Sequence, residues 1–538
     1  MSVRWGRLIL TGLGLLVLIA IGYWVAPSVE QNWDSNRLLE PLPQHPYIHV
    51  AFNQERSHRY TDPYRHIERY GEDLEALLIQ EIEQARYSIA VAVQEINLPD
   101  IAHALAGRQR AGLRVRVIVE NSYRRNWGEL TPSEIDRLDD DDRRKFAEYL
   151  QLVDSDRNGR ISLAERQHQD ALTILEAAEI PIVDDTEDGS RGSDLMHHKF
   201  MVVDDREVVT GSANWTLSGM HGDLNRRQSR GNANHLVTLS SDEIAQIFLE
   251  EFGLMWGDGP GGVLDSRFGV NKPERQVQQV QVGDATVGVH FSPAGAEVSY
   301  ALTSGGEIDR ALARASSSVD LALFVFSDRT IAERLQLLRD RGLNIRGVFD
   351  PGFAYRDFSQ TLTLWNLADD VCLSDNEPQR LPLETIGVPE LPDGDKLHHK
   401  FAIIDALGTS PTVVTGSYNW SNAANRKNDE TVLTISSPTV AAHFSREFDR
   451  LYRTATLGPP NFLLADAPKL EQCAPDEGIV VVNLNSASLD ELDTLPGIGP
   501  KLAERIVDAR PIRSLHDLEE IDGIGSGKVD DLRGLVVW

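Results

Sequence analysis

The sequence predicts an α/β protein built from two similar halves, with an inserted helix–loop–helix and a small all-α C-terminal domain. Three observations lead to this prediction. Residues 85–121 and 315–351 share one pattern, residues 154–165 form an acidic loop, and residues 483–532 contain a repeated helical hairpin. The chain has 538 residues, enough for about three or four domains, and 41% of them are hydrophobic, enough to bury cores.

Charge and cysteine usage exclude three kinds of protein. The chain has 53 Lys and Arg against 82 Asp and Glu, a formal net charge of −29. A surface this acidic does not hold nucleic acid by bulk positive charge, so any such contact must be local. Only Cys372 and Cys473 occur, which excludes a disulfide framework and a cysteine-built zinc site. One bridge between these two residues stays open.

The N-terminus carries an uncharged run, LILTGLGLLVLIAIGYWV, at residues 8–25, preceded by Arg4 and Arg7. At 1.5 Å per residue a helix of this length nearly spans a bilayer core. Because the basic side stays cytoplasmic, the rest of the chain is expected to be exported. Residues 1–28 are therefore interpreted as a signal anchor or a cleaved signal peptide, and these alternatives stay open. In both cases we expect the protein in the cell envelope, facing the periplasm, or secreted.

The two copies of the repeat each predict a β-α-β unit. An apolar strand is followed by an amphipathic helix that ends at Gly112 or Gly342, and then by a second apolar strand. This order predicts a largely parallel sheet covered by helices.

A second shared block follows each copy: HHKFMVVDDREVVTGSANW at 197–215 and HHKFAIIDALGTSPTVVTGSYNW at 398–420. Both blocks contain H-x-K-x4-D and then G-S-x-N-W. In a strand the His and the Lys point to the same side, so each half offers an imidazole beside an ammonium. Two such pairs around one phosphate could cleave its ester. One imidazole attacks phosphorus, the other protonates the leaving oxygen, and lysines and amides stabilise the added charge without a metal.

The paired blocks resemble the phospholipase D superfamily in its two-motif, single-chain form, over about residues 65–455. The resemblance implies two pseudo-two-fold-related domains, a phosphohistidine intermediate, and hydrolysis or transfer at phosphodiesters. Its site residues match His197, Lys199 and Asn214 in one half and His398, Lys400 and Asn419 in the other. Asp204 and Asp405 close the motifs and are expected to be structural supports. The domain boundaries are 65–255 for the first half with an insert at about 131–180, 256–285 for a connector, 286–455 for the second half and 456–478 for a linker.

Members of this superfamily often hold a motif histidine with a downstream carboxylate. The second half offers Glu430, whereas the first half has Asn234 at the matching place. Glu430 favours a charged imidazole, which suits His398 as the general acid and leaves His197 as the nucleophile, in line with relatives whose first motif attacks. If the carboxylate serves the opposite half, the two roles reverse.

The insert contains DSDRNGRISLAE at residues 154–165, which matches the EF-hand calcium loop with Gly159 at its sixth position. The expected calcium ligands are Asp154, Asp156, Asn158, Arg160 and Glu165. One helix, capped by TPSE at 131–134, is expected before the loop and another after it. A single EF-hand favours structural calcium, and the alternative is an acidic turn between helices.

Residues 479–538 contain two helix–turn–helix units, LPGIGPKLAERI and IDGIGSGKVDDL. Their G-I-G turns allow helix N-terminal amides to contact a phosphate. The candidate DNA contacts are Gly497, Gly499, Lys501, Gly523, Gly525 and Lys528. The segment resembles the tandem helix-hairpin-helix module of bacterial competence DNA receptors and repair proteins, which implies sequence-independent duplex binding. Its acidic charge opposes strong DNA binding, and a small packing domain is the alternative.

These observations favour an exported phosphodiesterase that acts on nucleic acid, with DNA preferred because of the C-terminal hairpins. The first alternative is a phospholipase D or phosphatidyl transferase acting on membrane phospholipid. The second is a non-catalytic envelope DNA receptor. Because one chain supplies both histidines, we expect a monomeric catalytic unit that needs no cofactor for catalysis.

Overall fold

The computed structural model describes residues 38–190, 194–367 and 382–466 and parts of 482–537. The chain forms two compact units, the larger one containing both repeats and the smaller one the C-terminal module. The apolar segment at 8–25 and both cysteines lie outside the described residues. Within the described part of the chain, no helix combines the length and apolar character that a bilayer crossing requires.

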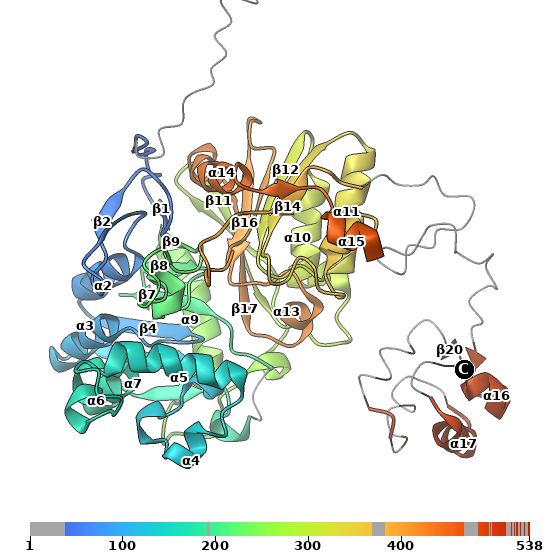
Figure 1. Cartoon of the computed structure of the whole chain (residues 1–538), viewed down its shortest axis with the longest axis horizontal. Helices are drawn as coiled ribbons and strands as arrows, with labels where there is room; N and C mark the ends of the chain where they lie inside the picture. The colour runs from blue at the N-terminus through green and yellow to red at the C-terminus, as the bar shows by residue number, and fades with distance from the viewer. Residues whose placement is uncertain are drawn as a thin grey trace, which may run out of the picture. The chain divides into compact units, whose positions relative to one another are not determined.

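The larger unit contains two extended sheets (Figure 1). The strand order is β1-β9-β8-β7-β4-β5-β6 in the first and β10-β11-β17-β16-β15-β12-β13-β14-β18 in the second. The first sheet comprises β1 (Ile48–Phe52), β4 (Ser88–Val93), β5 (Arg114–Val119), β6 (Ile182–Asp184), β7 (Lys199–Val203), β8 (Glu207–Gly211) and β9 (His235–Ser240). The second comprises β10 (Gln278–Val282), β11 (Ala285–Ser292), β12 (Ser318–Leu323), β13 (Asn344–Phe349), β14 (Ile386–Val388), β15 (Lys400–Ile404), β16 (Thr412–Gly416), β17 (Glu430–Ser436) and β18 (Thr456–Leu457).

Both sheets are mixed, so the prediction of a largely parallel sheet is wrong. β4, β5 and β6 pair in parallel, as do β12, β13 and β14. The motif strand β7 pairs antiparallel with both β4 and β8, and β15 does the same with β12 and β16. The reason is that each β-α-β unit supplies only parallel strands, whereas the motif block folds into short hairpins, whose strands must pair antiparallel.

Helices form layers outside and between the sheets. α2 (Leu74–Gln84) and α3 (Pro99–Arg110) pack together at the first sheet, as do α10 (Ser304–Ala313) and α11 (Arg329–Asp340) at the second. α9 (Asp242–Trp256) and α14 (Pro438–Tyr452) each contact strands of both sheets. Outside the insert, the described residues of the larger unit also form the short helices α8 (Leu217–Met220), α12 (Gln360–Leu364) and α13 (Asn422–Arg426). A separate hairpin is formed by β2 (Arg59–Thr61) and β3 (Glu68–Tyr70).

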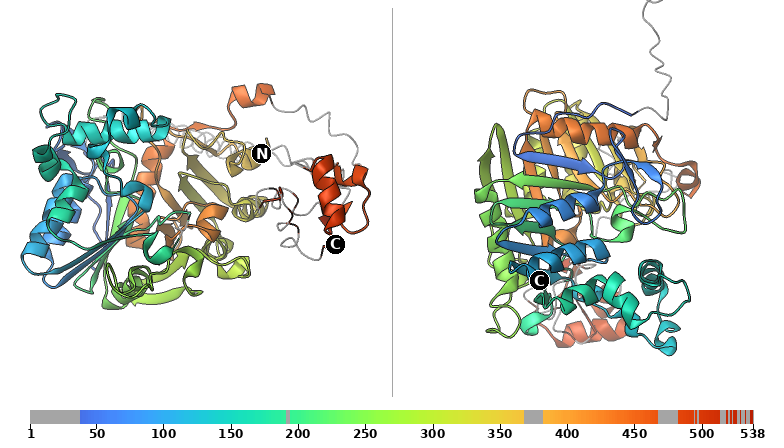
Figure 2. Two further views of the ribbon diagram at one scale, coloured as in Figure 1. Left: turned by 90° about the horizontal axis from the view of Figure 1, so that it is seen from below. Right: turned by 90° about the vertical axis from the view of Figure 1, so that its left-hand side faces the viewer.

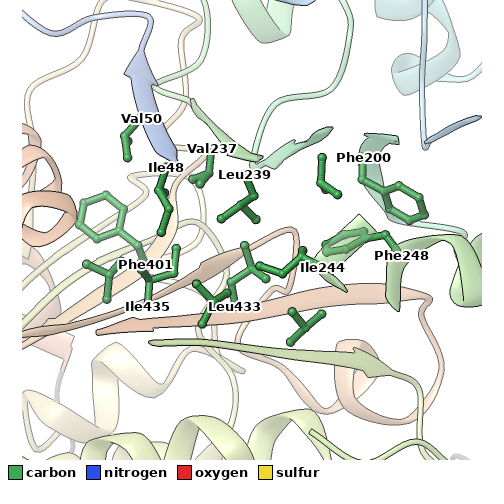
Figure 3. Close-up of a cluster of buried hydrophobic side chains, with 14 of the residues drawn as sticks. Ile48, Val50, Phe200, Val237, Leu239, Ile244, Phe248, Phe401, Leu433 and Ile435 are labelled. Carbon is green, nitrogen blue, oxygen red and sulfur yellow. The ribbon is translucent and has the colours of Figure 1, made fainter. Parts of the chain in front are cut away.

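One cluster of buried side chains joins the two repeats. Figure 3 shows Ile48 and Leu239 of the first sheet beside Leu433 and Ile435 of the second. Phe248 of α9 belongs to the same cluster. Because burying each such side chain contributes about 1.5–3 kcal/mol, this shared core holds the repeats in one fixed arrangement.

The insert lies at the periphery of the first repeat (Figures 1 and 2). It forms α4 (Pro132–Ile135), α5 (Asp140–Val153), α6 (Leu163–Gln169) and α7 (Ala171–Ala177). The Thr131–Glu134 capping box is present, but α4 ends after one turn and α5 begins separately. The helix expected after the loop is also divided, because the Asp170 carboxylate accepts the N–H groups of Leu172 and Thr173 and so starts a new helix.

The smaller unit has its own hydrophobic core, which includes Leu484, Leu492 and Ile506. Its described elements are α15 (Asn461–Asp466), α16 (Leu489–Asp493), α17 (Pro500–Asp508), β19 (Val482–Asn483) and β20 (Val536–Val537). β19 and β20 pair in parallel, so a short strand pair accompanies the expected helices.

Candidate active site

The two motif histidines lie two residues before the starts of β7 and β15, and each is anchored to the opposite half. The His197 N–H donates to the Asp429 carbonyl at 3.0 Å, and the His398 N–H donates to the Ala233 carbonyl at 3.1 Å. His197 therefore lies beside Glu430, the first residue of β17, and His398 lies beside Asn234, the residue before β9. This crossing brings all the motif blocks of the larger unit to one place.

Glu430 contacts His197 and not His398, which overturns the expected pairing. His197 Nδ1 lies 2.7 Å from Glu430 Oε2, and His398 Nδ1 lies 2.9 Å from Asn234 Oδ1. The cause is the crossing of the halves, which places β17 against the first motif. Both oxygens accept from Nδ1–H, so Nε2 is the ring atom that can attack or protonate a substrate.

Two buried lysines accompany the histidines. Lys199 Nζ donates to the His197 carbonyl at 2.7 Å and to Gln94 Oε1 at 3.2 Å. Lys400 Nζ donates to the His398 carbonyl at 2.7 Å and lies 4.9 Å from the centre of the Phe324 ring. Burial lowers the pKa of Lys199 to about 7, and burial together with the Lys199 charge holds the pKa of Lys400 well below its usual value.

Burial also sets the charge of the other groups. It lowers the pKa of both His197 and His398 far below the usual value, with repulsion from the two lysines adding to the effect. It raises the pKa of Glu430 to about 7. Both imidazoles are therefore neutral in the empty site. A bound phosphate would supply the negative charge that lets the lysines and one imidazole hold protons.

The G-S-x-N blocks supply polar groups from the ends of β8 and β16. Asn214 Oδ1 and Asn419 Oδ1 are buried and have no hydrogen-bond partner among the described residues. Buried acceptors without a partner are costly, so both amides are candidates for contact with substrate or water. Gly211, in contrast, is required by packing, because a Cβ there would lie 2.3 Å from the His235 carbonyl oxygen.

Sequence reasoning missed the serines of these blocks. Ser212 Oγ donates to Asn234 Oδ1 and Ser417 Oγ donates to Glu430 Oε2, both at 2.8 Å. They therefore position the two groups that hold the histidines. The signal was present, because serine occupies the same place in both G-S-x-N blocks.

Sequence reasoning also missed the residue between His and Lys in each motif. His198 Nε2 lies 3.2 Å from Glu251 Oε1, and His399 Nε2 lies 2.9 Å from Glu447 Oε1. All four side chains are buried. The available signal was the His-His pair that occurs in both motifs. The second histidine of each pair faces away from the motif His and Lys, and its contact with a carboxylate supports the motif strand from that other face.

Asp204 and Asp405 lie at the opposite ends of the motif strands from the histidines. Asp204 accepts the N–H groups of Arg86, Tyr87 and Ser88. Asp405 accepts the N–H groups of Ser316, Ser317 and Ser318 and the hydroxyls of the first two. Both carboxylates therefore hold the start of the first strand of a β-α-β unit.

Three acidic side chains of the loop at residues 154–165 lie close together. Ligand atoms of Asp154, Asp156 and Glu165 all lie within 4.8 Å of one another. Gly159 has φ +75°, and the Asn158 N–H donates to both aspartates at 3.0 Å. The Arg160 N–H donates to Asn158 Oδ1 at 2.7 Å. Three carboxylates on one side of a loop fit a hard divalent cation.

In the C-terminal module, Gly499 is the N-cap of α17 and Lys501 is exposed on that helix. Gly523 has φ +94°, and Lys528 donates to its carbonyl at 3.0 Å, while the Lys528 N–H donates to the Gly525 carbonyl. Gly497 lies outside the described residues.

A family model described as "Cardiolipin synthase, PLD-like domain" matches residues 78–256 and 308–452. The chain belongs to the phospholipase D-like family. A helix-hairpin-helix motif model matches residues 477–537. This phospholipase D-like chain is therefore a phosphodiester-acting enzyme with a C-terminal helix-hairpin-helix module.

The names of the relatives indicate different activities. A mouse mitochondrial cardiolipin hydrolase is 30% identical over 34% of this chain and 76% of its own length, and the human one is 32% identical over 27% and 48%. A deoxyribonuclease from Thioalkalivibrio sp. (strain K90mix) is 43% identical over 58 residues, 11% of this chain and 16% of its own length. Among solved structures, phosphatidylserine synthase from Haemophilus influenzae aligns with a TM-score of 0.45 and 13% identity, over 81% of this chain and 92% of its own.

Proposed function

We propose that the protein is an exported phosphodiesterase that cleaves nucleic acid, with DNA as the preferred substrate, through a phosphohistidine intermediate. The observation that carries this proposal is the pair of histidines, each held by the opposite half, with a buried lysine beside each. The helix-hairpin-helix module favours DNA, as does the likeness to a deoxyribonuclease. Export rests on the sequence of residues 1–28.

In the proposed reaction, Nε2 of one imidazole attacks phosphorus while the other imidazole gives its proton to the leaving oxygen. Water then attacks the phosphohistidine, with the second imidazole now acting as the base. Lys199 and Lys400 balance the charge of the five-coordinate phosphorus. Each step breaks one P–O or P–N bond as another bond to phosphorus forms.

We assign His197 as the nucleophile and His398 as the general acid. A carboxylate favours the protonated form of a neighbouring imidazole. Taken alone, the contact of Glu430 with His197 would therefore make His197 the general acid. However, burial keeps His197 neutral in the empty site. The phosphorylated ring is a cation, and Glu430 at 2.7 Å stabilises that cation. The neutral Asn234 amide leaves a protonated His398 the stronger acid.

The test is incubation of the full-length chain with plasmid DNA in EDTA, beside a His197→Ala control. We expect cleavage that survives EDTA and disappears in the variant. Cleavage that requires a divalent metal, or that persists in the variant, would contradict the two-histidine mechanism.

Phospholipid is the second candidate substrate, because the matching family model and several relatives are named for cardiolipin. Vesicles of phosphatidylcholine or cardiolipin, incubated in parallel, test it. Headgroup release without DNA cleavage would replace the nuclease assignment with a lipase that carries a DNA-binding module. DNA binding without turnover of either substrate would make the protein a receptor.

We also propose that the acidic loop holds one structural Ca²⁺ through Asp154, Asp156, Asn158, the Arg160 carbonyl and Glu165. Calcium at about 100 times its dissociation constant would stabilise the fold by about 2.7 kcal/mol. The readout is the melting temperature with and without Ca²⁺. We expect Glu165→Gln to remove the calcium-dependent rise, and an equal rise in the variant would exclude this loop as the site.

A further inference from the structure

A cleft in the larger unit concentrates positive charge in this otherwise acidic protein. It has a volume of about 1150 Å³ and adjoins the β2–β3 hairpin. Its charged lining consists of seven arginines and three carboxylates: Arg56, Arg65, Arg69, Arg227, Arg230, Arg450, Arg453, Glu68, Glu390 and Asp393. We call it the arginine cleft. Such a local excess is what the net charge of −29 requires of any anion-binding surface.

Several of these arginines are fixed in place by carboxylates behind the cleft. Asp62, which is fully buried, contacts Arg65 at 2.7 Å and Arg69 at 3.3 Å. Glu447 holds Arg450 through two contacts at 2.7 Å. The side chain of Arg69 is only 4% exposed, yet its Nε has no hydrogen-bond partner among the described residues. The cleft is therefore pre-organised, and one of its buried donors is unsatisfied.

The front of the cleft carries arginines that repel one another. Burial lowers the pKa of Arg230, and the charges of Arg450, Arg69 and Arg56 lower it further. Arg227 is exposed and lines the same cleft. Arranging like charges in this way costs free energy, which a bound anion would recover.

One stretch of polypeptide connects the arginine cleft to the active site. The Arg230 N–H donates to Asp395, the Ala233 N–H donates to the Lys396 carbonyl, and the His398 N–H donates to the Ala233 carbonyl. Residues 229–234 therefore run beside residues 395–398, from the cleft wall to the site. The four residues from Arg230 to Asn234 span at most about 14 Å.

We propose that the arginine cleft binds the phosphates of a nucleic-acid strand that flank the phosphate being cleaved. This inference rests on the proposed function and adds a substrate-binding surface to it. Several separate arginines suit a chain of phosphates better than the one or two phosphates of a lipid headgroup. The apolar and aromatic side chains of the lining are Ile67, Tyr70, Leu391 and Pro392, four against seven arginines.

The test compares two full-length double variants. Arg227→Glu with Arg230→Glu reverses charge in the cleft, and Arg314→Glu with Arg341→Glu reverses two exposed arginines outside it. The substrates are single-stranded oligodeoxynucleotides of two to twelve nucleotides and, separately, bis(p-nitrophenyl) phosphate. Both double variants carry the same C-terminal module, so its contribution cancels.

For the cleft variant we expect KM for the longest oligonucleotide to rise about tenfold with kcat little changed. The slope of log KM against log salt should fall by about 1.4, as expected for two lost phosphate contacts on a single strand. The dinucleotide, bis(p-nitrophenyl) phosphate and the control variant should show no such change. Unchanged KM and salt slope for the longest oligonucleotide would overturn the inference, and so would an equal rise for the dinucleotide.

Failure of the proposed function gives a different result. If the wild-type protein cleaves no oligonucleotide, anisotropy of a fluorescent twelve-nucleotide strand still measures the cleft directly, with a tenfold weaker dissociation constant expected for the cleft variant. Equal affinity would overturn the inference. If the cleft variant instead loses only its binding to cardiolipin vesicles, the cleft is a headgroup site and the nucleic-acid assignment is wrong.

Discussion

The two halves of the larger unit carry the same motifs on equivalent strands, yet they surround their histidines differently. The first histidine is held by the Glu430 carboxylate and the second by the Asn234 amide. The residue after the first strand also differs: Gln94 accepts a hydrogen bond from its lysine, whereas Phe324 places its ring beside the other lysine. The repeat thus fixes where the reactive groups stand, and a few unmatched neighbours decide how each one reacts.

The insert adds a second difference between the halves. Glu148 of α5 accepts hydrogen bonds from Asn97 Nδ2 and the Ser218 N–H, so the insert packs on the loop after β4 and on α8, which follows the first G-S-x-N block. In the second half, the described helix between β13 and β14 is the five-residue α12, and the Gln360 N–H donates to the Phe326 carbonyl after β12. The first half therefore carries a larger element at this place, which contacts Ser218, four residues after Asn214, and which a ligand of the acidic loop could stabilise.

The largest expected effect separates the roles of the two histidines. His197→Ala and His398→Ala should each lower kcat/KM on DNA by about 10⁴-fold or more, because one imidazole cannot serve both steps. On a p-nitrophenyl phosphodiester, whose leaving group needs no proton, His398→Ala should recover to within about 100-fold of wild type. His197→Ala should stay inactive on both substrates.

The opposite pattern, with recovery in His197→Ala, would exchange the nucleophile and the general acid. Substantial activity of either variant on DNA would contradict the two-histidine mechanism altogether. Asp136→Ala, an exposed change in the insert, is a suitable control.

A smaller effect is expected from the groups that hold the histidines. Glu430→Gln should lower kcat by about 10- to 100-fold, because the cationic phosphohistidine loses its counter-charge. Asn234→Asp should change kcat less, but it should move the alkaline limb of the pH–rate profile upward, since a carboxylate raises the pKa of His398. The measurement is the pH dependence of kcat for both variants and for the combined exchange.

A shift of the alkaline limb in Glu430→Gln instead of Asn234→Asp would show that His197 is the acid. Circular dichroism of each variant serves as the control for folding, because both side chains are buried.

The smallest expected effect is on the free energy of unfolding, and it distinguishes the two aspartates that close the motifs. Hydrogen bonds from backbone and serine groups outweigh partial burial and lower the pKa of Asp405 to about 2. A carboxyl with a depressed pKa stabilises the folded state above its unfolded pKa of about 3.9, and this contribution is lost as pH falls toward 2. Asp405→Asn should cost about 1–2 kcal/mol at pH 7, a value reduced for solvent exposure.

Urea unfolding at pH 7 and pH 3 measures this contribution. The gap between wild type and Asp405→Asn should be smaller at pH 3, and Asp204→Asn should cost less than Asp405→Asn because it loses no serine hydroxyl bonds. Equal gaps at both pH values would contradict the assigned contribution of the carboxylate.

Local patterns determined much of the fold. The helices that precede Gly112 and Gly342 end where predicted, since both glycines take a positive φ of +89° and +88° that stops a helix. Sequence also identified the capping box of the insert. It did not predict the break at Asp170, because that residue can start a helix as well as occupy one, and packing decided between the two. The antiparallel motif strands were missed for a related reason: pairing direction depends on where a hairpin docks.

The candidate active site, like the fold, was predictable from the sequence only in part. The sequence by itself determined which residues can do the chemistry, because two-residue spacing in extended chain places His and Lys on one face. Only the tertiary structure decided that Glu430 holds His197, that Ser212 and Ser417 position the supporting groups, and that arginines distant in sequence meet in one cleft. Such contacts join residues far apart in the chain. They are set by the packing of the two halves around their shared core, which no local pattern encodes.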